Sequence, residues 1–194
     1  MKRPVSVHGR RPPRPSAAWA RKLAACLVGA WLCLGATRAV GVELAEYEVK
    51  AAFIYNFAKF TEWPRESAKE NFHFCVLGHD PFGEALDGLA EKTVRDRPIA
   101  VARGIDAAEA KSCDVLFVHE AGGESRNATL KRLAGLPILT IGDQPGFAQG
   151  GGMIEMVMVD HRVQFEVNLD AVRSAKLKIS SQLLKLARKV AGVP

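Results

Sequence analysis

Short apolar runs alternate with amphipathic segments along the middle of the chain. The apolar runs lie at residues 72–77, 99–102, 114–118 and 138–141. The segments that follow the first three have helical spacing and lie at residues 81–90, 106–111 and 124–133. This alternation predicts right-handed βαβ units, and hence an α/β fold with a doubly wound, mostly parallel sheet and helices on both faces. In the strand order 2-1-3-4 of such sheets, the first and third strands are neighbours.

A longer amphipathic segment, residues 43–63, precedes this region. Its apolar side chains recur at helical spacing, and Pro64 is expected to end the helix. Such a stripe most commonly packs in a core, and its members here are Val49, Phe53, Phe57 and Phe60. The other side of the helix carries Tyr55, Lys59 and Glu62, which are candidate partner-binding residues.

The pattern changes in the last third of the chain. A glycine-rich stretch, residues 142–152, is expected to form a loop that needs positive φ at several positions and is anchored by Phe147. Two apolar runs, at 153–159 and 163–167, flank a short polar connection and predict an antiparallel hairpin at one edge of the sheet. Residues 169–190 are expected to form one long helix, whose stripe on the sheet is Ile179, Leu183, Leu186 and Val190.

The charge of the chain is distributed unevenly. Residues 1–39 hold 8 of the 27 Lys and Arg and none of the 21 Asp and Glu, so residues 40–194 carry a net charge of −2. The formal net charge of +6 therefore does not indicate a nucleic-acid partner. The basic start is followed by the apolar run 23–34 and by small residues, which is the order of a secretory signal peptide with cleavage after Ala39. A retained anchor and acylation at Cys26 are the alternatives.

Removal of this segment would leave residues 40–194 as a single domain outside the cytoplasm. Of the four cysteines, Cys75 and Cys113 would remain. Exported proteins with two cysteines commonly pair them, and these two lie on neighbouring predicted strands, so we expect a disulfide. Two buried reduced thiols are the alternative, and a zinc site is disfavoured because there is no Cys-x-x-Cys pair.

Polar side chains follow the predicted strands at the ends where open α/β sheets bind ligands. His79 and Asp80 follow the first strand, His119 follows the third and Asp143 the fourth. They form a candidate crevice for a metal ion or a polar ligand. The alternative is structural, because Asp80 before Pro81 is typical of a helix N-cap and Asp143 lies in turn-like sequence. No motif of a hydrolase, a zinc protease or a nucleotide-binding loop is present, so we expect no enzyme, no cofactor and no bound metal.

Four stretches of the chain resemble the YfiR-like family of periplasmic proteins. They are residues 46–64 (EYEVKAAFIYNFAKFTEWP), 78–83 (GHDPFG), 146–154 (GFAQGGGMI) and 175–184 (AKLKISSQLL). The resemblance implies a periplasmic α/β protein that is not an enzyme. The best understood members restrain an inner-membrane diguanylate cyclase by binding its periplasmic sensor region. The resemblance also places the family's structural disulfide at Cys75 and Cys113, whereas the second cysteine pair of some members has no counterpart here.

Two functions from different classes follow from these observations. The first is a periplasmic signalling regulator whose partner is the sensor region of an inner-membrane diguanylate cyclase or another signalling protein, with a homodimer left open. The second is a periplasmic small-ligand or metal receptor that uses the crevice of His79, Asp80, His119 and Asp143. Neither function requires nucleic acid.

Overall fold

The computed structural model describes residues 46–64, 70–119 and 125–192, all within one compact unit, Glu43–Pro194. The predicted signal peptide, residues 1–39, lies outside the described residues. Within the described part of the chain, no helix has the length and apolar character that crossing a bilayer requires.

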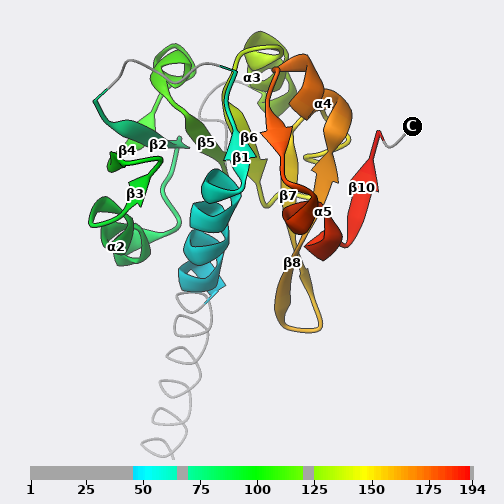
Figure 1. Ribbon diagram of the computed structural model, residues 1–194, viewed down its shortest axis with the longest axis horizontal. Coiled ribbons are helices and arrows are strands. Elements are labelled where there is room, and N and C mark those ends of the chain that lie inside the picture. Colours follow the sequence, from blue (N-terminus) through cyan, green and yellow to red (C-terminus); the bar gives the residue numbers. More distant parts are fainter. Residues whose placement is uncertain (1–45, 65–69, 120–124, 193–194) are drawn as a thin grey trace, which may run out of the picture. The chain divides into compact units, whose positions relative to one another are not determined.

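An eight-stranded sheet forms the centre of the unit, in the order β10-β8-β7-β6-β5-β2-β4-β3 (Figure 1). Its strands are β2 (Phe72–Leu77), β3 (Thr93–Val94), β4 (Arg97–Ile105), β5 (Val115–Val118), β6 (Leu139–Gly142), β7 (Ile154–Val159), β8 (Arg162–Asn168) and β10 (Lys189–Ala191). The four strands β4-β2-β5-β6 are parallel, which confirms the predicted order 2-1-3-4. The hairpin of β7 and β8 is antiparallel, as predicted, and the short β10 pairs with its outer strand.

Helices cover both faces of the sheet, as predicted. Alternate side chains of β2 enter two separate cores, with Phe74 in one and Cys75 in the other. The first core also includes side chains from the helical residues 46–59 and from α2 (Asp87–Ala90) and α5 (Ser181–Leu186). The second includes side chains from α3 (Arg126–Leu133) and the 3-10 turn η2 (Glu109–Ser112). The remaining helical elements are η1 (Gly83–Leu86) and α4 (Leu169–Ser174).

The helix at residues 46–59 differs from its prediction in rotation and in length. Phe57 is buried as expected, but Val49 is 45% exposed and Phe60 is 38% exposed. The buried stripe consists of Tyr47, Lys50, Ala51, Ile54, Phe57 and Ala58. The helix ends at residue 59 because the next residues form β1 (Thr61–Glu62), which pairs antiparallel with β9 (Lys178–Ile179).

The single long helix predicted for residues 169–190 is wrong. The chain forms α4, β9, α5 and β10 instead, in that order. Lys176 adopts positive φ, which interrupts the helix, and Ser180 then caps α5 by accepting a hydrogen bond from the amide of Leu183. As a result Leu186, expected on the sheet, is 73% exposed.

The glycine-rich loop is anchored by Phe147, as predicted. The ring of Phe147 is fully buried, and a Cβ atom added to Gly142 or Gly152 would lie 2.4 or 2.1 Å from it. The buried carboxylate of Glu155 accepts hydrogen bonds from two backbone amides of this loop, at 3.1 and 2.9 Å. The loop that follows β6 is therefore held rigidly against the sheet.

Candidate functional site

Cys75 and Cys113 form a disulfide, with their Cα atoms 6.0 Å apart. Cys75 lies on β2, and Cys113 is two residues before the neighbouring strand β5. Both cysteines are buried. The bridge closes a loop of 38 residues, so in the chain-entropy account it destabilises the unfolded state by about 4 kcal/mol.

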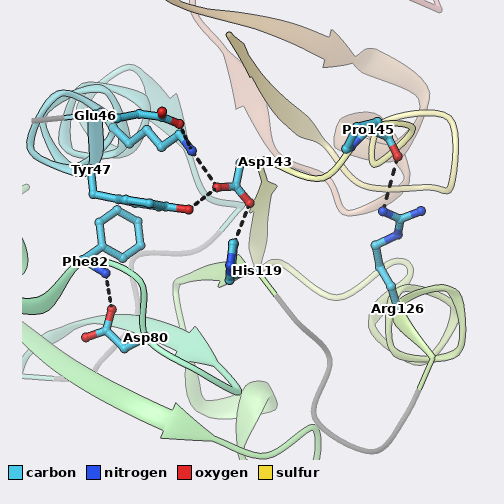
Figure 2. Close-up of polar contacts among 9 residues, drawn as sticks. Glu46, Tyr47, Asp80, Phe82, His119, Arg126, Asp143 and Pro145 are labelled. Atoms are coloured by element: carbon cyan, nitrogen blue, oxygen red, sulfur yellow. Dashed lines mark hydrogen bonds and ion pairs between the residues drawn. The ribbon is translucent and has the colours of Figure 1, made fainter. Parts of the chain in front are cut away.

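His119 and Asp143 meet at the carboxyl ends of two neighbouring parallel strands. The register pairs Val118 of β5 with Gly142 of β6, so the next residue of each strand lies at the same level. His119, with a proton on Nδ1, donates to Oδ1 of Asp143 at 2.9 Å (Figure 2). Asp143 is almost fully buried, whereas 21% of the His119 side chain is exposed.

The helix at residues 46–59 completes this group of side chains. Lys50 Nζ donates to Oδ2 of Asp143 at 2.6 Å, and the hydroxyl of Tyr47 donates to the same oxygen at 3.0 Å. Lys50 also lies 2.6 Å from Oε1 of Glu46, one turn earlier in the helix. Only 5% of the Lys50 side chain is exposed, so this ammonium group depends on its carboxylate partners. We call Glu46, Tyr47, Lys50, His119 and Asp143 the strand-end cluster.

The environment of Asp143 favours its charged form. Burial acts to raise the pKa of the carboxyl, but the hydrogen bonds and the charges of Lys50 and His119 outweigh it. The pKa of Asp143 therefore lies below its ordinary value. The cluster holds an ionised carboxylate between a buried cation and an imidazole.

Aromatic rings enclose one side of the strand-end cluster. The ring of Tyr47 meets Phe82 edge to face at 5.2 Å, and Phe82 meets Phe117 at 4.7 Å. His119 stacks on Phe117 with ring centroids 6.5 Å apart. These contacts exclude water from the side of the cluster that faces the core, and they fix the orientation of the Tyr47 hydroxyl.

The other two residues of the predicted crevice have a different environment. Oδ1 of Asp80 accepts a hydrogen bond from the amide of Phe82 at 2.8 Å (Figure 2). Oδ2 of Asp80 pairs with Arg103. His79 is exposed. Among the described residues, no polar contact links His79 or Asp80 to the pair of His119 and Asp143. The structure thus brings together two of the four predicted crevice residues.

The sequence of this chain matches the YfiR/HmsC-like family model over residues 47–188. The chain belongs to the YfiR/HmsC-like family. The match begins at Tyr47 and includes four members of the strand-end cluster, both bridged cysteines and every strand of the central sheet except β10.

Two solved structures resemble this YfiR/HmsC-like chain weakly. A conserved domain protein from Vibrio cholerae O1 biovar eltor str. N16961 is similar with a TM-score of 0.48 and 10% identity, over 72% of this chain and 59% of that chain. The ABC domain in complex with L-Trp from Streptococcus pneumonia is similar with a TM-score of 0.45 and 9% identity, over 62% and 55%. The chain thus spans less than two thirds of the length of either structure.

Of the predicted partner-binding residues, Tyr55 and Lys59 lie at the far end of the same helix, and Glu62 lies in β1. The ring of Tyr55 is flanked by two ammonium groups, Lys59 at 5.4 Å and Lys92 at 5.5 Å from its centroid. The Tyr55 hydroxyl donates to the carbonyl oxygen of Thr93 at 3.3 Å, so the half-buried ring is held in one orientation. Lys59 and Glu62 are exposed, as expected for an outward-facing position.

Three members of the strand-end cluster were not predicted as site residues. Glu46, Tyr47 and Lys50 lie within the helix whose apolar stripe was assigned to other positions. The available signal was the spacing of Lys50, which lies on one helical face with Tyr47, Ile54 and Phe57. A lysine on the buried face of a helix requires a buried acidic partner, and Asp143 supplies it.

The chemistry of the strand-end cluster is that of a closed network. Both oxygens of Asp143 are already occupied by Tyr47, Lys50 and His119. Within residues 46–64, 70–119 and 125–192, no group of three or more His, Cys, Asp or Glu side chains has a geometry that would hold a metal ion. The cluster ties the helix to the carboxyl ends of β5 and β6.

Proposed function

We propose that this protein is an exported, non-enzymatic regulator that restrains an inner-membrane diguanylate cyclase by binding its periplasmic sensor region. The observation that carries the proposal is the family match over residues 47–188, since YfiR-like proteins are periplasmic regulators. Residues 1–39, with their basic start and apolar run, are the proposed signal peptide, and residues 40–194 the functional domain. Intact mass of the exported protein should give a chain that starts at Val40, and a full-length chain in the cytoplasm would contradict export.

The proposed contact surface consists of Tyr55, Lys59, Phe60 and Glu62. It combines an oriented aromatic ring with a 38% exposed phenylalanine and two exposed, oppositely charged side chains. Aromatic residues with fixed orientation lose little entropy on binding and are common anchors of protein interfaces. This surface includes residues from the end of the helix and from β1.

The strand-end cluster supports this role by fixing the helix that carries the surface. Lys50 and Tyr47 attach the helix to Asp143, and Phe57 packs against Phe165 of β8 at a centroid distance of 4.8 Å. A surface that is rigid before binding avoids part of the ordering cost of association.

Restraint of a cyclase requires only a difference in affinity for its two states. A regulator that binds the inactive state more tightly by about 3 kcal/mol lowers the active population roughly a hundredfold when the active state is rare. No catalytic group is needed for this effect, and the strand-end cluster is already satisfied by its own residues.

Genetics and binding together test the proposal. Deletion of the gene should raise cellular cyclic di-GMP, thicken biofilm and reduce motility, and deletion of the partner cyclase as well should cancel all three effects. Calorimetry with the periplasmic region of the cyclase should show at least a tenfold loss of affinity for Lys59→Glu. The control is Lys111→Glu, an exposed charge reversal on η2, which should bind like the wild type. Unchanged cyclic di-GMP in the single deletion, under several growth and envelope-stress conditions, would refute the proposal.

A further inference from the structure

Positive charge is concentrated in the last elements of the domain. Residues 169–192 contain six Lys and Arg and one Asp, a net charge of +5, whereas residues 40–168 have a net charge of −7. These last residues form α4, β9, α5 and β10. Figure 1 shows α4, α5 and β10 on the β8 side of the sheet, and β9 pairs with β1. The domain is therefore electrically asymmetric although its overall charge is slightly negative.

Four lysines of this region are exposed and have no ion-pair partner in the part of the chain that the structure describes. They are Lys176, Lys178, Lys185 and Lys189. The two arginines nearby differ, because Arg188 pairs with Glu166 at 3.0 Å and Arg173 with Asp170 at 3.8 Å. None of the four lysines has an ion-pair partner within residues 46–64, 70–119 and 125–192. Their charges are directed to solvent instead of stabilising the fold.

An exposed apolar side chain lies among these charges. Leu186 ends α5 and is 73% exposed, more than the other large hydrophobic side chains of the described surface. It follows Lys185 directly and precedes Lys189 by three residues. An apolar side chain surrounded by flexible cations is the arrangement by which proteins attach to the surface of a membrane with anionic lipids.

We propose that the surface formed by Lys176, Lys178, Lys185, Leu186 and Lys189, the basic surface, binds the anionic headgroups of a phospholipid membrane. The composition favours lipid over protein, since lysine is depleted at protein interfaces but attracts anionic lipid without a fixed geometry. Lys178 of β9 lies opposite Glu62 of β1, so the basic surface adjoins the proposed cyclase-contact surface. Membrane binding would hold the regulator near the membrane in which its proposed partner resides.

Vesicle sedimentation tests the basic surface directly. The purified protein should sediment with vesicles that contain phosphatidylglycerol and not with vesicles of phosphatidylcholine alone. Binding should weaken as ionic strength rises, because the Debye length shortens to about 8 Å at 0.15 M salt. Because the domain has a net charge of −2, its overall charge cannot produce this attraction.

Two double variants with the same change in net charge provide the matched comparison. Each lysine near the membrane surface contributes about fivefold to the affinity for anionic lipid. The double variant Lys185→Gln with Lys189→Gln should therefore lower the affinity for anionic vesicles about 25-fold. Lys111→Gln with Lys131→Gln removes two exposed lysines from the opposite face of the sheet and should lower it less than about threefold. Leu186→Ser should weaken binding at every ionic strength without altering its salt dependence.

Several results would overturn the proposal. Equal binding to neutral and anionic vesicles would do so, as would equal losses in the two double variants. Failure of the wild-type protein to sediment with anionic vesicles at low ionic strength would also refute it. Salt-sensitive self-association in sedimentation velocity, without vesicle binding, would show that the lysines face an acidic protein surface instead.

Discussion

Replacement of Asp143 by asparagine tests the energetic role of the strand-end cluster. Asparagine preserves the shape of the side chain and can still accept a hydrogen bond from Tyr47, but it removes the charge that Lys50 contacts at 2.6 Å. Both side chains of that ion pair are 5% exposed. The ammonium group of Lys50 would keep one carboxylate partner, Glu46, which is 25% exposed, and its contact with the Tyr47 ring at 4.2 Å. Removal of one partner from a buried ion pair typically costs 3–5 kcal/mol of unfolding free energy. Because Glu46 would still neutralise part of the Lys50 charge, we expect a loss of about 3 kcal/mol, at the lower end of this range.

Urea unfolding at neutral pH, with the disulfide intact, measures this loss as a lower midpoint with an unchanged slope. Asp87→Asn is the matched control. Asp87 also forms an ion pair, with Arg103, but its side chain is 70% exposed, so removal of its charge should cost less than about 0.5 kcal/mol. The combined variant Asp143→Leu with Lys50→Met should recover much of the stability, since it leaves no buried charge unpaired. A loss below about 1 kcal/mol for Asp143→Asn would refute the reasoning.

The pH dependence of stability provides a second readout of the same group. Because the pKa of Asp143 is lowered in the folded protein, unfolding takes up a proton at acidic pH, and the stabilisation is lost as the pH falls. The contribution should be complete above about pH 5, where the carboxyl of the unfolded chain is also ionised, and should decline below about pH 4. The difference in stability between wild type and Asp143→Asn should therefore shrink on acidification, and a constant difference would contradict the lowered pKa.

Three further predictions concern the core and the crevice. Cys75→Ser should lower the unfolding free energy by about 4 kcal/mol and the melting temperature by about 10 °C, and two alkylated thiols in unreduced, denatured protein would contradict the disulfide. Gly152→Ala should cost more than about 2 kcal/mol because its Cβ would overlap the Phe147 ring, whereas Gly88→Ala, with open space at its Cβ, should be neutral or stabilising in thermal unfolding. Calorimetry should detect no micromolar Zn²⁺ binding, and tight binding lost in His119→Ala would favour the receptor hypothesis.

The parallel strands β2, β5 and β6 could be predicted because each is a short apolar run that is almost wholly buried, whereas β4 is longer than its prediction and mostly only partly buried. β2 has the predicted bounds, β5 begins one residue later than predicted, and β6 is shifted by one residue. The missed strands β1, β3, β9 and β10 have two or three residues each, too few to produce a periodic pattern. They form because tertiary contacts bring suitable backbone segments together.

The last third of the chain shows why helical periodicity alone can mislead. The apolar residues 179, 183 and 186 have helical spacing, but α4 ends at Ser174 and Lys176 adopts positive φ. A lysine gives no sequence signal of positive φ, which is uncommon for residues other than glycine. Ser180 was the available signal, because serine favours the N-cap position and accepts the amide of Leu183 there. A helix start at this point would have divided the predicted helix into two.

The strand-end cluster could be predicted only in part for a similar reason. Strand order places His119 beside Asp143, since both directly follow paired strands. Nothing in that argument indicates a helix distant in sequence, and a lysine within an amphipathic segment is ordinarily assigned to the solvent face. The rotation of the helix is thus set by an ion pair that its apolar pattern does not reveal.

This rotation connects the buried network to the proposed contact surface. Burial of Tyr47 and Lys50 against Asp143 directs Val49 and Phe60 outward, and it leaves Tyr55 half-buried with its ring between two lysines. If the helix took the rotation that its phenylalanines favour, Phe60 would be covered and the surface would lose one of its two aromatic side chains. Asp143 therefore acts as a positioning residue for a surface that it does not touch. Loss of its charge should weaken partner binding and stability together, whereas Lys59→Glu should weaken binding alone.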